Sequence, residues 1–364
     1  MLNTPKKRKY QFAIFIGRFQ PFHNAHLKIA LNGLELADHL IMVIGSHACA
    51  PSTRNPWTSE ERSSMIHLGL PPDQHHRVTV AAVRDYLYND NIWLRELQNQ
   101  VNRIIRQTTD DAYPKVILIG HHKDDTSYYL NLFPQWKFQE ESTIRFDAGR
   151  KDEISGTQIR HSFFTNGRTG NNQLICPVGD LNVPPAVQTS LEAYRDTQDF
   201  LDIQKEFEYL TNYKNQWRDS PFPPTFNTTD AVVIRSGHVL IVKRGRRPGK
   251  GQYALPGGFL NQRESIVNGM LRELAEETNI LVHKDDLRKA ICDQRVFDHP
   301  ERSARGRILT HAFCLNLGDG ELPKVSGADD ADEALWMSLL EVGVNERCFF
   351  EDHLHIIQYF TNKF

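Results

Sequence analysis

Residues 257–280 read GGFLNQRESIVNGMLRELAEETNI, a pair of glycines followed by a glutamate-rich helical stretch from Ile266 to Glu277. Glu273, Glu276 and Glu277 stand at positions i, i+3 and i+4, so a helix turns their carboxylates to one side. Like charges at this spacing repel each other by roughly a few tenths of a kcal/mol per pair. A hard divalent cation relieves that repulsion, because Mg²⁺ takes carboxylate oxygens and keeps positions for phosphate oxygens and water. The stretch therefore predicts a site for Mg²⁺, with Mn²⁺ as an alternative.

The residues around this helix fit the same interpretation. Gly257 and Gly258 allow a backbone turn that can bring Glu264 to the same ion, and Arg272 can orient a carboxylate by a charge-assisted hydrogen bond. A solvated acidic helix face is the alternative, but it gives no reason for the spaced glycines, glutamate and arginine. The expected metal ligands are Glu264, Glu273, Glu276 and Glu277.

This stretch resembles the Nudix signature, G-x5-E-x7-R-E-U-x-E-E-x-G-U, in which U is aliphatic. Eight of its nine fixed positions match, and the departure is Asn279 in place of glycine. Asparagine tolerates left-handed backbone better than most residues, so the helix can still end there. The resemblance implies an α/β/α sandwich with a mixed sheet. It also implies a magnesium-dependent hydrolase of a nucleoside diphosphate linked to a second group, with Glu276 and Glu277 in catalysis.

Arginines on either side of the motif suit a diphosphate. Val242 to Pro248 ends a strand with several cations, and Gln294 to Pro300, with the arginines at 302, 305 and 307, resembles a segment of ADP-ribose pyrophosphatases. A solvated basic loop is one alternative, and a dinucleotide or sugar-nucleotide substrate is another. The favoured substrate is ADP-ribose, cleaved to AMP and ribose 5-phosphate. The residues expected to contact it are Arg244, Arg246, Gly257, Gly258 and Arg295.

The first half of the chain alternates short apolar runs with helical patterns. One helical stretch, His26 to Ala37, separates the first two runs. This alternation predicts a mostly parallel sheet covered by helices, and in such sheets ligands bind beyond the carboxyl ends of the strands. The expected strands are Phe12–Ile16, Leu40–Ile44, Val78–Val83 and Val116–Ile119.

The segment GRFQPFHNAH, from Gly17 to His26, directly follows the first expected strand and precedes a helix. Gly17 lets a phosphate approach the backbone, and the helix start offers unpaired N–H groups and the positive end of its dipole. His23 and His26 can both donate to one phosphate. An isolated His-x-x-His would more often cap a helix, but the preceding strand, glycine and Arg18 favour a phosphate site.

A second helix start is expected in ISGTQIR, from Ile154 to Arg160. Ser155 or Thr157 can cap it, and Arg160 points back toward a ligand bound there. Alone, this segment would be an ordinary capped helix. Together with the first segment it resembles the nucleotidylyltransferase superfamily, with its H-x-G-H loop and I-S-x-T-x-x-R signature. Ala25 stands where that loop usually has glycine.

The resemblance to archaeal-type nicotinamide mononucleotide (NMN) adenylyltransferases is closer and covers about residues 10–175. That family has a G-R-x-Q-P-x-H-x-G-H opening, a later segment like RNPWTSEER at Arg54–Arg62, and an aspartate and a tryptophan after a middle strand, here Asp85 and Trp93. The sequence departs from the family at His121, where asparagine is expected. The resemblance implies a Rossmann-like domain, with helices on both faces of a parallel sheet, that makes NAD and pyrophosphate from ATP and NMN.

Roles follow from this resemblance position by position. Trp93 would stack on the nicotinamide ring, unless it packs as a core residue of an amphipathic helix. NMN brings its own phosphate as nucleophile, so the protein needs only to align two anions and to stabilise charge on the α-phosphate and pyrophosphate, together with Mg²⁺. The residues expected around the ATP phosphates are Arg18, His23, His26, Arg54 and Arg160, with Gly17, Ser155 and Thr157 beside them. Those expected near the nicotinamide are Asp85, Asn91 and Trp93.

Both halves together resemble the bifunctional NMN adenylyltransferase/Nudix hydrolase family over essentially the whole chain. We expect an adenylyltransferase domain at residues 1–185, a connecting helix and linker at 186–225, and a Nudix domain at 226–364, with two separate sites. The helix would run from Ala186 to Trp217, before a strand at Ala231–Ile234. A rival interpretation is a Nudix-type ligand-sensing regulator, but the metal motif is intact and little chain is left for a DNA-binding module.

Composition narrows the class of protein. A length of 364 residues suggests about two domains, and a net charge of −2 argues against nucleic-acid binding through overall basicity. No apolar run approaches the ~18 residues that span a bilayer. Five scattered cysteines without a Cys-x-x-Cys pair are typical of reduced cytosolic thiols. The basic run Lys6–Lys9 is typical of a solvated N-terminal arm, with a targeting signal as the alternative. The sequence predicts a cytoplasmic enzyme whose partners are ATP, NMN, NAD and ADP-ribose, without nucleic acid or membrane, and leaves a homo-oligomer open.

Overall fold

The computed structural model describes residues 8–121, 125–141, 154–165 and 181–361. It contains two compact units: unit 1 is Met1–Ala48, Arg54–Asp85 and Asn89–Gln204, and unit 2 is Cys49–Thr53, Tyr86–Tyr88 and Lys205–Phe364. In the described ranges, no helix has the length and apolarity needed to cross a membrane. The four described cysteines, Cys49, Cys292, Cys314 and Cys348, are free thiols. Cys176 and the first two lysines of the basic run lie outside the described residues.

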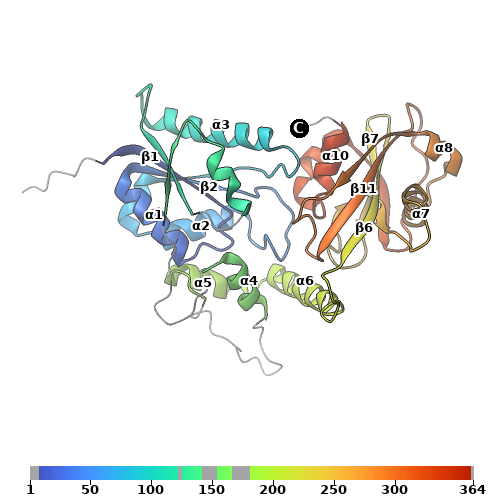
Figure 1. Ribbon diagram of the computed structural model, residues 1–364, viewed down its shortest axis with the longest axis horizontal. Coiled ribbons are helices and arrows are strands. Elements are labelled where there is room, and N and C mark those ends of the chain that lie inside the picture. Colours follow the sequence, from blue (N-terminus) through green and yellow to red (C-terminus); the bar gives the residue numbers. More distant parts are fainter. Residues whose placement is uncertain (1–7, 122–124, 142–153, 166–180, 362–364) are drawn as a thin grey trace, which may run out of the picture. The chain divides into compact units, whose positions relative to one another are not determined.

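Unit 1 is built on a five-stranded sheet with the order β3-β2-β1-β4-β5, and each of its strand pairs is parallel (Figure 1). All four predicted strands are confirmed. The fifth strand escaped prediction because it is short and polar at an edge of the sheet. The strands are β1 (Tyr10–Gly17), β2 (Ala37–Ile44), β3 (Val78–Ala82), β4 (Val116–Gly120) and β5 (Lys137–Glu140).

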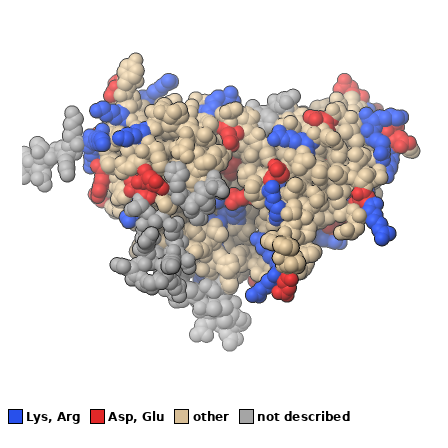
Figure 2. Space-filling model, viewed as in Figure 1, with Lys and Arg blue, Asp and Glu red and all other residues tan. Residues whose placement is uncertain are grey.

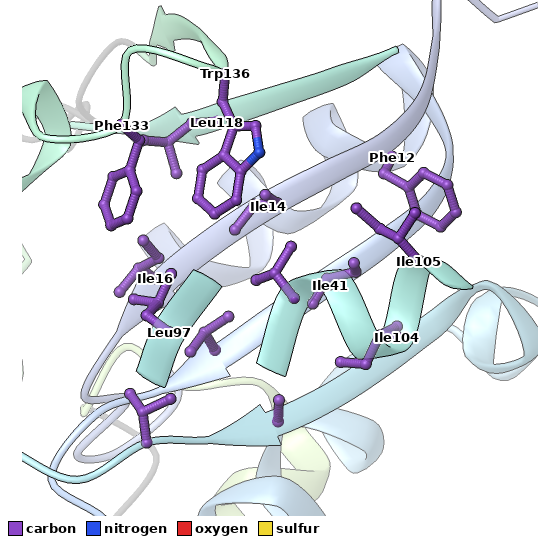
Figure 3. Packing of buried hydrophobic residues seen from close by; sticks show 14 of the residues in the cluster. Phe12, Ile14, Ile16, Ile41, Leu97, Ile104, Ile105, Leu118, Phe133 and Trp136 are labelled. Atoms are coloured by element: carbon purple, nitrogen blue, oxygen red, sulfur yellow. The ribbon is translucent and has the colours of Figure 1, made fainter. Parts of the chain in front are cut away.

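Alternate residues of the unit 1 strands pack against helices on opposite faces. On β1, Ile14 belongs to a core cluster with Leu97 and Ile104 of α3 (Asp90–Thr108), as Figure 3 shows. Ala13 faces the other way, toward Gly33 of α1 (Asn24–Leu36), where an added Cβ would lie 3.6 Å from that of Ala13. Both faces of the central strands are therefore buried, which explains their continuous apolar runs.

The single helix predicted from Ala186 to Trp217 is wrong: the structure has α5 (Pro185–Tyr194) and α6 (Gln198–Asn215). Thr197 lies at the break. Its hydroxyl donates to the Tyr194 carbonyl at 2.7 Å and accepts from the Phe200 N–H at 3.2 Å, so it ends one helix and caps the next. The other helices of this unit are α2 (Ser59–Gly69), α4 (Gly156–Thr165) and the 3₁₀ turns Pro72–Arg77 and Asp125–Asn131.

Unit 2 contains a mixed sheet with the order β10-β11-β6-β7-β12, to which β8 and β9 add through β7 and β6. The β6–β11 pair is parallel and the other pairs are antiparallel. The strands are β6 (Thr225–Arg235), β7 (His238–Arg244), β8 (Tyr253–Ala254), β9 (Gly257–Phe259), β10 (Ile291–Phe297), β11 (Arg307–Asn316) and β12 (Ala331–Ser338).

Helices cover both faces of the unit 2 sheet (Figure 1). Val233 of β6 packs in one cluster with Leu274 of α7 (Ile266–Thr278), and its neighbour Val232 packs in another with Ile356 of α10 (His353–Thr361). This is the predicted α/β/α sandwich. Two short helices, α8 (Lys284–Lys289) and α9 (Leu339–Val344), and the 3₁₀ turn Glu346–Cys348 complete the unit. On the face drawn in Figure 2, cationic and anionic side chains are interspersed over uncharged surface.

Candidate active sites

The first candidate site lies at the carboxyl ends of the unit 1 strands. Because β2 and β3 follow β1 on one side while β4 lies on its other side, the strand order reverses at β1, the place where such sheets bind ligands. The loops that follow the strands are tied to one another there. The Gly45 N–H donates to the Gly17 carbonyl at 3.0 Å, and the His47 N–H donates to the Val83 carbonyl at 3.0 Å.

The two histidines of the first loop start α1. His23 is the N-cap, and each histidine accepts, at ring atom Nδ1, the backbone N–H of the other at 3.4 Å. Their rings stack with centroids 3.5 Å apart, and the His26 ring also contacts Phe19 at 4.9 Å. The capping role weighed against phosphate binding is thus present, and it fixes both imidazoles at the positive end of the helix dipole.

Arg160 joins the second motif to this loop. Its guanidinium donates to the Gln20 carbonyl at 2.7 Å and to the Thr157 hydroxyl at 3.2 Å. Burial lowers its pKa to about 10, and the charge of Arg18 adds to the effect. Gly156 permits this approach, because a Cβ there would lie 2.9 Å from the Gln20 carbonyl oxygen. The structure therefore brings the two sequence motifs together.

Hydrogen bonds to Ser155 and Asp85 shape the rest of this site. The Ser155 hydroxyl accepts from the Gln158 N–H at 3.2 Å, so Ser155 caps α4 as one of the two predicted candidates. The Asp85 carboxylate accepts from the N–H of Ser46 at 3.0 Å and from its hydroxyl at 2.6 Å. This pairing joins the ends of β2 and β3.

Arg62 is the last residue of the RNPWTSEER segment that resembles the adenylyltransferases, but no role was predicted for it. It is 1% exposed and donates to the carbonyls of Arg18, Gly45 and Ser46 at 2.7–3.0 Å. Its guanidinium therefore sets the shape of two loops at the site. The sequence shows Arg62 only as an arginine near the start of a helix. Ordinary exposed arginines occupy the same position, so the sequence did not indicate its buried role.

The residues expected around the nicotinamide are dispersed along α3 and the loop before it. Trp93 is partly buried and packs against the core, with its ring 5.7 Å from Tyr129 and 6.2 Å from Phe133. This is the packing named as the alternative to ring stacking. Asn91 is exposed and Arg54 half-buried, and the stacking role of Trp93 stays a prediction.

The second candidate site centres on α7, which begins after the N-cap Ser265. Arg272 gathers three of the predicted ligands. Its guanidinium donates to Glu264 at 2.6 and 3.0 Å, to Glu273 at 2.8 Å and to Glu276 at 2.9 Å. The hydrogen bonds from Arg272 lower the pKa of Glu264 to about 2, so this carboxylate is fully charged near neutral pH. Asn279 ends the helix in left-handed backbone with φ 44°, as the sequence predicted.

The fourth predicted ligand, Glu277, is held apart from the arginine. It is 7% exposed and accepts from the Gly257 N–H at 2.9 Å. Burial raises its pKa to about 8, and the nearby charge of Glu273 contributes. Gly258 leaves room for Glu273, because a Cβ there would lie 2.6 Å from one carboxylate oxygen.

The four carboxylates were expected to converge on one point, and the structure divides them. In the described part of the chain, no three carboxylate, imidazole or thiol groups are gathered as ligands of one ion. Arg272 reduces the mutual repulsion of Glu264, Glu273 and Glu276. Burial raises the pKa of Glu277, so this carboxylate carries only part of its negative charge near neutral pH. The residues nevertheless fit a divalent cation, because hard oxygen donors outnumber the arginine beside them. Among the residues that the structure describes, no salt bridge is formed to the buried Glu277, which accepts from the Gly257 N–H.

The predicted substrate arginines differ in their surroundings. Arg244 is stacked 4.2 Å from the Phe350 ring centroid and lies close enough to Glu277 to favour its charged form. Arg246 instead pairs with Asp330 at 2.6 Å at the surface, and Arg295 stands 4.3 Å over the Tyr359 ring. Arg244 is therefore placed next to the acidic motif, while the contacts of Arg246 and Arg295 are with other residues.

Arg302 was expected among the arginines suited to a diphosphate, but the structure places its side chain, 2% exposed, in a buried charged network beside this motif. Arg302 donates two hydrogen bonds to Asp352 at 2.8 and 2.9 Å, and Asp230 lies 4.0 Å from the same guanidinium. Glu351 accepts from the Ser303 hydroxyl at 2.7 Å and has left-handed backbone with φ 45°. An aspartate inside an apolar strand, as Asp230 is, indicates a buried charge that needs a partner. The sequence does not identify that partner, because Arg302 lies far along the chain.

Comparison with known proteins identifies both halves. Residues 14–162 match the cytidylyltransferase-like family model, and residues 225–360 match the NUDIX domain model. A nicotinamide/nicotinic acid mononucleotide adenylyltransferase of Acinetobacter baylyi is 29% identical over 199 residues, which are 55% of this chain and 94% of that protein. An ADP-ribose pyrophosphatase of Methanocaldococcus jannaschii is 33% identical over 110 residues, 30% of this chain and 60% of that protein.

Solved structures of one relative match nearly the whole chain. It is a bifunctional NMN adenylyltransferase/ADP ribose pyrophosphatase from Francisella tularensis, complexed with AMP and a manganese ion. The two sequences are 32% identical, the match covers 97% of this chain and 99% of the other, and the TM-score is 0.84.

Proposed function

This chain belongs to the bifunctional NMN adenylyltransferase/ADP-ribose pyrophosphatase family, and from this premise we propose that it is an enzyme with two activities. Unit 1 transfers the adenylyl group of ATP to NMN, giving NAD and pyrophosphate. Unit 2 hydrolyses ADP-ribose to AMP and ribose 5-phosphate with Mg²⁺ or Mn²⁺. The observation that carries the proposal is that each unit holds a full site motif: two capping histidines with Arg160 in one, and four glutamates with Arg272 in the other.

In unit 1, the stacked imidazoles of His23 and His26 donate to the ATP phosphates at the start of α1, where the helix dipole also favours negative charge. Arg18 and Arg160 add positive charge beside them, and we place Arg54 in the same role. NMN supplies the attacking phosphate, so the protein contributes alignment and charge stabilisation rather than a base. Asp85, Asn91 and Trp93 are proposed to position the NMN.

In unit 2, a bound divalent cation would supply positive charge for the diphosphate oxygens and acidify a water molecule. The carboxylates of Glu264, Glu273, Glu276 and Glu277 are proposed to hold it. Arg272 keeps the first three of these oriented. Arg244 is proposed to bind a phosphate, with Gly257 and Gly258 allowing close approach of the backbone. Arg246 and Arg295 are proposed as outer contacts of the same substrate.

Two assays on one preparation test this assignment: NAD formation from ATP plus NMN, and AMP release from ADP-ribose. His26→Gln should abolish only the first activity, because glutamine at this position can still cap the helix while the imidazole is lost. Glu276→Gln should abolish only the second. If either substitution removed both activities from a folded protein, separate sites would be refuted.

We also propose a cytoplasmic location, which the free thiols support, and nucleotides as the partners of the protein rather than nucleic acid or membrane.

A further inference from the structure

Two of the four described cysteines lie side by side at one edge of the unit 2 sheet. Cys292 belongs to the edge strand β10, and Cys314 belongs to the neighbouring strand β11. The Cys292 thiol donates to the Cys314 carbonyl oxygen at 3.4 Å. We call these two residues the thiol pair.

The pairing of the two strands turns both thiols to the same face of the sheet. Ile291 pairs with Leu315, and both pack in the cluster that contains α7 residues. Cys292 directly follows the first of these residues and Cys314 directly precedes the second, so alternation turns both side chains to the opposite face. The register then shifts, and Asp293 is the residue paired with Cys314. At such a bulge two residues of one strand stand opposite one residue of the other, which keeps Cys292 beside Cys314.

The members of the thiol pair differ in their access to solvent. Cys292 is exposed, whereas Cys314 is only 5% exposed. Burial raises the pKa of the Cys314 thiol to about 12, and a hydrogen bond and the charge of Cys292 add to the effect. A reagent in solution therefore meets Cys292 first, while Cys314 stays covered and protonated beside it.

An exposed thiol next to a covered one suits reversible oxidation, because the second thiol can displace an adduct formed on the first. We propose that the thiol pair is a modification site at which a low-molecular-weight disulfide, such as oxidised glutathione, converts Cys292 and Cys314 to a cross-strand disulfide. This site is additional to the two enzymatic activities and does not depend on them.

The reaction consists of two thiol–disulfide exchanges. Cys292 loses its proton, and its sulfur attacks one sulfur of oxidised glutathione, which breaks that S–S bond and releases one glutathione thiolate. Cys314 then loses its proton, and its sulfur attacks the Cys292 sulfur, which forms the protein disulfide and releases the second glutathione thiolate. The two thiolates take up the two protons. Two protein thiols are thereby oxidised, and one glutathione disulfide is reduced to two glutathione thiols.

The disulfide would join the two ends of the segment that connects β10 to β11. It would also hold the oxidised sulfur of Cys292 in a bond that thiol reductants reverse, whereas oxidation of a cysteine to sulfinic acid is generally irreversible. The covered thiol of Cys314 thus protects the exposed one.

The test treats the reduced full chain with oxidised glutathione, blocks the remaining thiols with N-ethylmaleimide, and analyses tryptic peptides by mass spectrometry without reduction. Trypsin cleaves after Lys289, Arg295, Arg307 and Lys324, so the peptides 290–295 and 308–324 should appear joined by a disulfide. Dithiothreitol should separate them and restore both thiols.

Three substitutions assign the roles within the thiol pair. Cys314→Ala should abolish the joined peptides and leave one glutathione on Cys292. Cys292→Ser should leave Cys314 unmodified, and this change at an exposed position decides the question even if Cys314→Ala fails to fold. Cys348→Ser is the matched control, because it removes an exposed cysteine of another element, and it should leave the yield of joined peptides at the wild-type value.

Three results would overturn the proposal. In the first, the wild-type chain accumulates glutathione on Cys292 without forming the joined peptides. In the second, Cys292 forms its disulfide with Cys348 or with a second copy of the chain. In the third, Cys314 of the Cys292→Ser variant takes up glutathione as fast as Cys292 does in the Cys314→Ala variant, which would show that Cys314 is not the covered member of the pair.

Discussion

Asp352→Asn should strongly destabilise unit 2. The Arg302 side chain is 2% exposed and the Asp352 side chain 0%, and two hydrogen bonds join them. Asparagine keeps the volume but leaves a buried guanidinium without its charge partner, a loss that costs about 3–5 kcal/mol. Asp230, 4.0 Å from the guanidinium, compensates in part, so we expect about 3 kcal/mol. For a domain of this size that corresponds to a fall in Tm of roughly 6–12 °C.

The assay is calorimetric unfolding of the full chain, with both activities measured at 25 °C. Asp330→Asn is the matched control, because it breaks the Arg246–Asp330 pair at 2.6 Å with the same chemical change in side chains that are 69% and 48% exposed. An exposed pair contributes about 0–1 kcal/mol, so the control should move Tm by roughly 4 °C or less. Adenylyl transfer should persist in both variants. If the two substitutions shifted Tm equally, burial would not determine the value of the ion pair and the reasoning would fail.

Three further predictions concern single residues of unit 2. Burial lowers the pKa of His353, whose Nδ1 accepts from the Leu255 N–H, so below pH ~6.5 an unfolded chain binds a proton that the folded unit does not. The free energy of unfolding should therefore decrease as the pH is lowered below this value. His353→Asn should flatten this pH dependence in unfolding titrations. Asn279→Ala should cost about 1–2 kcal/mol by the strain of left-handed backbone, whereas Asn279→Gly should be close to neutral in denaturant unfolding. Gly258→Ala should lower hydrolysis about 100-fold or more, because its Cβ would displace the Glu273 carboxylate, with NAD formation as the unchanged internal control.

Periodic patterns predicted the elements of the fold well because they depend on neighbours in the chain. Four strands of unit 1 were found from apolar runs, and α7 from a glutamate-rich helical stretch in which Glu273, Glu276 and Glu277 stand at i, i+3 and i+4. The break between α5 and α6 was missed because a single threonine, Thr197, supplies it. Its bond to the Tyr194 carbonyl is one that threonine also makes inside helices, so the residue type alone does not mark a helix end. Strand β5 was missed because its pairing to β4, rather than its own composition, makes it a strand.

Some residues of the candidate sites were likewise predictable from the sequence, and others were not. The resemblance to the nucleotidylyltransferases implied that Arg160 and the Gly17–His26 loop belong together, and in the structure Arg160 donates to the Gln20 carbonyl of that loop. Arg62 and the Arg302–Asp352 pair were not predictable, because burial gives these charges their role and their partners come from distant segments. A single sequence does not distinguish a buried arginine from the many solvated ones.

The chemistry of the two sites gives a physical reason for their separation. Unit 1 brings imidazoles and guanidinium groups together, as the proposed phosphate site requires, and its site motif lies entirely within that unit. The motif of unit 2 instead carries four carboxylates, Glu264, Glu273, Glu276 and Glu277, which are proposed to hold a divalent cation. In one shared cavity the two sets would neutralise each other by ion pairing, as Arg272 already does for three glutamates, and neither the phosphates nor the cation would find an uncompensated partner. Opposite charge requirements therefore favour two domains on one chain over one site with two activities.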